Sequence, residues 1–243
     1  MGADHPDTRR HRVTTTVCLI LAASPEAGRA PALHEEHRDV QRSVTHARFG
    51  HLLRLDVLPA ARAEDLVQYL AATVPHVLHF AGRGTPDGGP RFVTDDGGEA
   101  PVALDGLRDC VADAAPLGLR LVVLNACWTE PLAKELANRV PAAIGWERQV
   151  PDAHACAYAR VFYRNLAEGD SVLSAHATAC KLLALIGCTG LPVLHSAPGH
   201  LPEAHFLIAA SDRPVPPGKP LTPRWYRSPG PPRKPWFPRP PQA

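Results

Sequence analysis

A cysteine and a histidine lie in two apolar runs, each long enough to be a buried strand. Cys127 closes the run 121–127 (LVVLNAC), and His79 lies within the run 77–81 (VLHFA), which leads into the turn 82–84. Open parallel sheets bind ligands beyond the carboxyl ends of their strands. A thiol at one strand tip beside basic side chains at another therefore predicts a shared crevice with a thiolate nucleophile.

The elements that would position these residues alternate between strand and helix. The runs predict strands at 17–23, 52–58, 77–81, 119–126, 142–146 and 205–210, a hairpin of 92–93 with 102–103, and helices at 31–47, 63–73, 104–114, 131–140, 152–167 and 171–186. Such alternation implies right-handed crossovers and a mostly parallel sheet. We expect an α/β fold, a three-layer α/β/α sandwich.

Charge and proline content divide the chain into a body and a tail. Residues 211–243 hold seven Lys and Arg against one Asp, and 12 of the 27 prolines, whereas residues 1–210 hold 19 basic and 23 acidic side chains. A Pro-rich segment without an apolar pattern cannot build a core. We expect a disordered segment at 1–14, a folded domain at 15–210 and a disordered basic tail at 211–243. The mildly acidic body argues against a nucleic-acid surface on it.

The tail carries a signal of its own. Proline recurs at every third residue from Pro214 to Pro223 and again from Pro229 to Pro241. A polyproline II helix has three residues per turn, so each series would line one face of an extended rod. Such rods bind adaptor domains with aromatic grooves. A solvated extension without a fixed partner is the alternative.

The six cysteines form neither a CxxC pair nor a metal-type spacing with the 13 histidines. In a chain of this length they indicate reduced, buried thiols in a cytoplasmic protein, with no metal and no cofactor. The basic stretch 9–12 before the apolar run 17–23 also fits a minimal secretory signal, so both readings stay open. No segment approaches the ~20 apolar residues that a membrane span requires.

Several short motifs together resemble the bacterial CHAT domain, a branch of the caspase-like cysteine peptidases. They follow the family's order within about residues 17–186: 21–25 (LAASP), 33–36 (LHEE), 79–84 (HFAGRG), 124–127 (LNAC), 143–146 (AIGW) and 162–163 (FY). The resemblance implies a caspase-like sheet, a protein or peptide substrate and Cys127 as the nucleophile. It also implies a role in bacterial defence or regulated protein cleavage.

The chain departs from the family at the catalytic histidine. The family's Gly-His-Gly turn reads Gly82-Arg83-Gly84 here, so Arg83 stands where the resemblance implies the histidine. An arginine, with a pKa above ~12, can hold a thiolate by charge but cannot exchange a proton with it. His79 lies four residues upstream, roughly 13 Å away in an extended strand, which favours a structural, hydrogen-bonded role. His154 is a second imidazole that could approach the crevice.

The resemblance also predicts which residues border the substrate: Gly82, Gly84, Asn125, Trp128, Trp146 and Asp152. Asp152 could pair with a basic substrate side chain, but it also fits the N-cap of the helix that follows. The two tryptophans either frame the mouth of the pocket or fill the core.

Two functions remain open for the crevice. Thr129 and Pro131 mark the start of a helix directly after Cys127, and the unpaired N–H groups of a helix start favour a thiolate. The first hypothesis is a cysteine peptidase weakened by Arg83. The second is an inactive pseudopeptidase that binds proteins or peptides without cutting them.

Overall fold

A computed structural model of the protein describes residues 15–21 and 33–209. Its main sheet has the strand order β2-β1-β3-β6-β7-β8, in which β8 alone is antiparallel to its neighbour. The strands are β1 (Thr15–Leu21), β2 (Leu53–Leu58), β3 (Val77–Ala81), β6 (Leu121–Asn125), β7 (Ala142–Trp146) and β8 (Pro192–Ser196). The segments expected at 1–14 and 211–243, and the predicted helix start at Pro31, lie outside the described residues.

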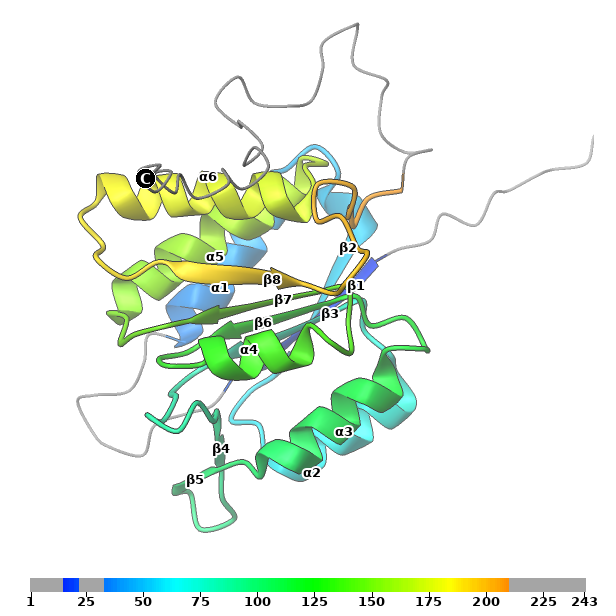
Figure 1. Cartoon of the computed structure of the whole chain (residues 1–243), viewed down its shortest axis with the longest axis vertical. Coiled ribbons are helices and arrows are strands. Elements are labelled where there is room, and N and C mark those ends of the chain that lie inside the picture. The colour runs from blue at the N-terminus through cyan, green and yellow to red at the C-terminus, as the bar shows by residue number, and fades with distance from the viewer. Residues whose placement is uncertain (1–14, 22–32, 210–243) are drawn as a thin grey trace, which may run out of the picture.

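Helices cover both faces of the sheet. They are α1 (Leu33–Thr45), the short 3-10 helix η1 (Gly50–Leu52), α2 (Ala63–Ala72), α3 (Leu104–Ala114), α4 (Glu130–Leu136), α5 (Asp152–Ala167) and α6 (Val172–Leu185). In Figure 1, α1, α5 and α6 lie on one face, and α2, α3 and α4 lie on the other. The predicted three-layer α/β/α sandwich is therefore confirmed.

Alternation along the central strands assigns side chains to the two faces. Odd-numbered residues of β3 and β6, such as Val77 and Val123, pack in the apolar cluster under α1, α5 and α6. Even-numbered residues, such as Leu78 and Val122, pack in the cluster under α2, α3 and α4. This period of two places His79, Asn125 and Cys127 on the α1 and α5 face.

The prediction of the last strand was wrong. Residues 205–209 form no strand, and Phe206 makes only an isolated bridge to Ser171. Leu207 and Ile208 are nevertheless buried, so this apolar run fills the core without joining the sheet. The actual edge strand β8 begins at Pro192, and a short run that opens with proline gives a weak strand signal.

Three smaller expectations met different outcomes. The hairpin forms, but β4 (Arg91–Val93) pairs with β5 (Glu99–Pro101), earlier in the chain than predicted. The apolar run after the basic N-terminal stretch forms β1, between β2 and β3. The five cysteines whose side chains are described form no disulfide and are half-exposed rather than buried.

Across 15–21 and 33–209, no helix has the length and apolar character to cross a membrane.

Candidate active site

The exit turn of β3 packs against the tip of β6. Ala81 pairs with Asn125 in parallel register, and two further residues bring Arg83 level with Cys127. A Cβ on Gly84 would lie 1.9 Å from the carbonyl oxygen and 3.1 Å from the amide nitrogen of Cys127. Since real Cβ atoms never come so close to backbone, only glycine fits at position 84. The arginine turn and the cysteine are therefore immediate neighbours.

Cys127 is half-buried, and its sulfur meets the backbone of Val150. The Val150 N–H donates to Sγ over 3.3 Å, and the Val150 carbonyl oxygen lies 3.8 Å from Sγ. The sulfur thus accepts from a backbone N–H, and the Val150 carbonyl is placed to accept from the thiol. The donor thus comes from the segment before α5. The sequence had predicted instead that N–H groups at the start of α4 would act on the sulfur.

The residue after the cysteine has a strained backbone. Trp128 has a φ of 55°, in the left-handed region that non-glycine residues rarely adopt. Its N–H donates to the carbonyl of Arg148 over 3.4 Å, and its side chain is half-buried. Thr129 follows as the N-cap of α4, but its buried hydroxyl bonds the carbonyl of Ala126 at 2.7 Å instead of capping the helix. The chain therefore turns sharply at Cys127.

His79 is fully buried on the face of the sheet that α1 and α5 cover. Its Nε2–H donates to Oε1 of Glu36 over 2.9 Å, and the Tyr163 hydroxyl lies 2.9 Å from Nδ1. Both ring nitrogens are engaged, on the α1 and α5 face of the sheet. Its imidazole is thus held in a buried network, which fits the structural role that the sequence favoured, and a catalytic role for His79 remains a prediction.

Asn125 belongs to the same network. Its Nδ2 donates to Oε1 of Glu36 over 2.8 Å and to the carbonyl of Ala155 over 3.1 Å, while its Oδ1 accepts from Nε1 of Trp146 at 2.8 Å. Asn125 is 3 % exposed and Trp146 is 1 % exposed. Both side chains are therefore buried within this network, and their place in the lining of a substrate pocket remains a prediction.

The buried network connects Glu36 on α1 to the segment that contacts the Cys127 sulfur. The bond from Asn125 to Ala155 ties the start of α5 to the tip of β6, and Val150 lies just before that helix. Sequence reasoning gave Glu36 no role, although a signal was present. Glu36 shares the spacing of the buried Val40 and Val44, and a carboxylate on a buried helix face requires partners.

Two further candidates lie in the first turn of α5. Asp152 is its first residue and is exposed, while Pro151 occupies the N-cap, so the capping prediction was wrong. An acid in a first turn is still favoured by the helix dipole. His154 is half-buried, and its Nδ1 is buried without a hydrogen-bond partner among the described residues. Side chains of a first turn lean towards the helix start, which is the end where Val150 lies.

Other cysteines are held as thiols. Burial, with Glu36 and Asp152 adding to it, raises the pKa of Cys156 to about 12. Burial also raises the pKa of Cys180 to about 12, and it raises the pKa of Cys110. These three groups are therefore poor nucleophiles at neutral pH. No cluster of three or more metal-binding side chains occurs in the described part of the chain.

Comparisons with known proteins point to one family. The model of the CHAT domain family matches residues 3–184. A Roc-COR-CHAT protease from an unknown prokaryotic organism is 25 % identical over 191 residues, which cover 75 % of this chain and 18 % of that protein. This chain therefore spans less than a fifth of that relative's length.

A solved structure shares the fold. A secreted C11 cysteine protease from Bacteroides thetaiotaomicron, in complex with an irreversible peptide inhibitor, aligns with a TM-score of 0.53 and 13 % identity, covering 70 % of this chain and 59 % of that one. At this identity the likeness concerns the fold alone, a mostly parallel sheet flanked by helices.

The contact between Gly84 and Cys127 predicts the effect of adding one methyl group. Gly84→Ala should lower the free energy of unfolding by about 1–3 kcal/mol, because its Cβ would overlap the Cys127 carbonyl. Gly106→Ala is the matched control, since a Cβ there meets nothing within 4 Å and helix α3 gains propensity. Urea denaturation measures both. Equal stability of Gly84→Ala and the wild type would show that the turn does not lie on Cys127.

The buried network predicts a second stability effect. Asn125→Leu should lower the free energy of unfolding by about 2–4 kcal/mol, because Glu36 and the Trp146 N–H each lose a buried partner. Asn138→Leu, at an exposed position, should change it by less than about 0.5 kcal/mol. Chemical denaturation of both variants tests the network, and similar values for the two would contradict it.

Proposed function

The chain belongs to the CHAT domain family, and we propose that it is a caspase-like cysteine peptidase domain whose hydrolysis is weakened by Arg83. One observation carries this proposal: Gly84 packs on the backbone of Cys127, so the residue before that glycine lies beside the nucleophile. The family resemblance implies a histidine at this place, and this chain has an arginine. The protein is therefore expected to keep the nucleophile and to lack its usual proton carrier.

Peptide cleavage requires a proton transfer that Arg83 cannot perform. The sulfur forms a bond to the carbonyl carbon, the C–N bond breaks, and the leaving amine takes a proton. That proton starts on the thiol and normally travels through an imidazole. A guanidinium stays protonated at every working pH, so Arg83 carries the proton in neither direction. What remains is the Val150 N–H, which donates a hydrogen bond to the sulfur but transfers no proton.

An inactive, peptide-binding domain is the second candidate. The contacts of His79 favour this candidate, because both of its ring nitrogens are engaged in the buried network and are not available to Cys127. His154, four residues beyond Val150 in the chain, is the other imidazole that the sequence suggests for this crevice. Loss of all cleavage in His154→Ala would indicate a peptidase that has moved its base to α5. An unchanged low rate would support weakened hydrolysis without an imidazole.

The partners that we propose follow from the family. Protein or peptide segments would bind across the tips of β3 and β6, with Gly82, Gly84, the half-buried Trp128 and the exposed Asp152 at the border. The described cysteines form no disulfide, which fits a cytoplasmic location. The Pro-rich segment 211–243 lies outside the described residues, and an adaptor domain as its partner remains a prediction.

The decisive variant restores the imidazole. Arg83→His should raise kcat/KM for peptide cleavage by about 100-fold or more, because general acid–base catalysis of this kind contributes 10²–10⁴-fold. Cleavage of a fluorogenic peptide library measures the rate. The double variant with Cys127→Ala should have none.

Arg83→Gln is the matched control, because it removes the charge without adding an imidazole and should leave the rate within a few-fold of the wild type. Two results would defeat the proposal. One is a wild-type rate typical of active cysteine peptidases. The other is an Arg83→His protein that is folded and no faster than Arg83→Gln.

A further inference from the structure

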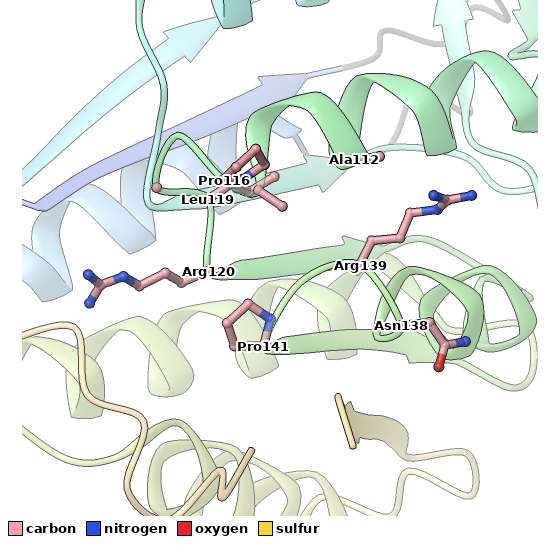
Figure 2. A pocket seen from close by; sticks show the side chains of 9 residues that line it. Ala112, Pro116, Leu119, Arg120, Asn138, Arg139 and Pro141 are labelled. Atoms are coloured by element: carbon pink, nitrogen blue, oxygen red, sulfur yellow. The ribbon is translucent and has the colours of Figure 1, made fainter. Parts of the chain in front are cut away.

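A hollow in the described part of the chain lies at the amino ends of β6 and β7, away from Cys127. It has a volume of about 640 Å³ and lies between the end of α3 and the loops that lead into these two strands. Figure 2 shows its two arginines, Arg120 and Arg139, pointing in opposite directions. The two guanidinium groups therefore do not converge on one ligand. The buried network around Glu36, by contrast, bears directly on Cys127.

Asn125 holds the start of α5 against the tip of β6. Its Nδ2 donates to the Ala155 carbonyl over 3.1 Å, and the Ala155 N–H donates in turn to the Pro151 carbonyl over 3.1 Å. Val150, which precedes Pro151, donates its N–H to the Cys127 sulfur over 3.3 Å. Because Asn125 and Cys127 are two residues apart at the end of one strand, these contacts form a closed ring. The place of the sulfur and the orientation of the Asn125 side chain are therefore coupled.

The partners of Asn125 allow only one orientation of its amide. Nδ2 donates to Oε1 of Glu36 at 2.8 Å and to the Ala155 carbonyl, while Oδ1 accepts from Nε1 of Trp146 at 2.8 Å. A flipped amide would set its oxygen against two acceptors and its NH2 group against a donor. Both N–H groups of Nδ2 are thus used, and one of them depends on Glu36.

Glu36 is placed to fix that orientation. It is 4 % exposed, and its Oε1 also accepts from Nε2 of His79 at 2.9 Å. One carboxylate oxygen on α1 therefore joins β3 to β6. Without this oxygen a buried N–H of Asn125 would lose its acceptor, and such a loss is costly enough to make the amide turn or draw in water.

We propose that Glu36 is a positioning residue for the Cys127 nucleophile, acting through Asn125 and the start of α5. This inference rests on the proposed function, because it concerns the thiol that the function requires. The ring of contacts sets where the sulfur points, and attack on a carbonyl carbon depends on that geometry. A misplacement of about 1 Å can lower the rate of such a step by about 100-fold. Glu36 thus acts without contact to the reacting atoms.

Two thiol probes, applied to the full chain, separate positioning from stability. A mixed-sequence peptidyl chloromethyl ketone reacts from a bound pose and needs an oriented thiol, whereas iodoacetamide reacts with any accessible thiol. In Glu36→Ala we expect the peptide probe to label Cys127 about tenfold more slowly or less, and iodoacetamide to label it within a few-fold of the wild-type rate. Mass spectrometry follows each cysteine. Glu35→Ala, at the exposed neighbouring position on α1, is the matched control and should leave both rates unchanged.

Two conservative variants keep the test valid if Glu36→Ala does not fold. Both hydrogen bonds end on Oε1, so Glu36→Gln can offer the same oxygen and should react with the peptide probe within a few-fold of the wild-type rate. Glu36→Asp keeps the charge but is one methylene shorter, so it should react more slowly than Glu36→Gln. The opposite order would show that charge matters and position does not, which would overturn the inference.

Two other results would refute a positioning role while leaving the proposed function intact. One is a Glu36→Ala protein that reacts with the peptide probe at the wild-type rate. The other is iodoacetamide labelling of Cys127 and Cys110 that rises together, because this would indicate a loosened fold. A wild-type Cys127 that does not react with the peptide probe would refute the proposed function, and this inference with it.

Discussion

The close approach between the exit turn of β3 and the tip of β6 is the constraint on which the site depends. The two strands are parallel neighbours near the middle of the sheet, and the carbonyl of Cys127 occupies the place where a side chain at position 84 would lie. Because that position must be glycine, the residue before it is held beside Cys127. In this chain that residue is Arg83, and our proposal is that its identity decides what chemistry the thiol can perform.

A buried carboxylate holds the polar side chains near the ends of β3 and β6 in a structural network. Glu36 accepts from both His79 and Asn125, and the asparagine in turn holds the start of α5. A buried acid of this kind is tolerated only with its partners in place. The histidine that looks catalytic in the sequence thus serves the architecture. Its contribution to the site is indirect, through the placement of the segment that carries Val150.

The fold, and the position of Cys127 at the tip of β6, could be predicted because they depend on local patterns. Strand runs, amphipathic spacing and strand-to-helix alternation placed β1, β2, β3, β6 and β7, whereas β8 is a short edge strand that opens with proline and gave no such pattern. The contacts that define the site come from tertiary packing. Trp146 was assigned to a pocket because a strand-end tryptophan can face either way. The hydrogen bond from the Val150 N–H to the Cys127 sulfur could not be predicted, because a backbone donor does not depend on which side chain is present.

The reactivity of the six cysteines towards an electrophilic peptide tests the central claim most directly. The probe would be mixed with the native protein, and mass spectrometry would follow the labelling of each cysteine over time. We expect Cys127 to be labelled at least about tenfold faster than Cys110, Cys156 and Cys180, whose thiols are held protonated by burial. Uniform labelling, or labelling of Cys127 only after denaturation, would contradict an open thiol at the tip of β6.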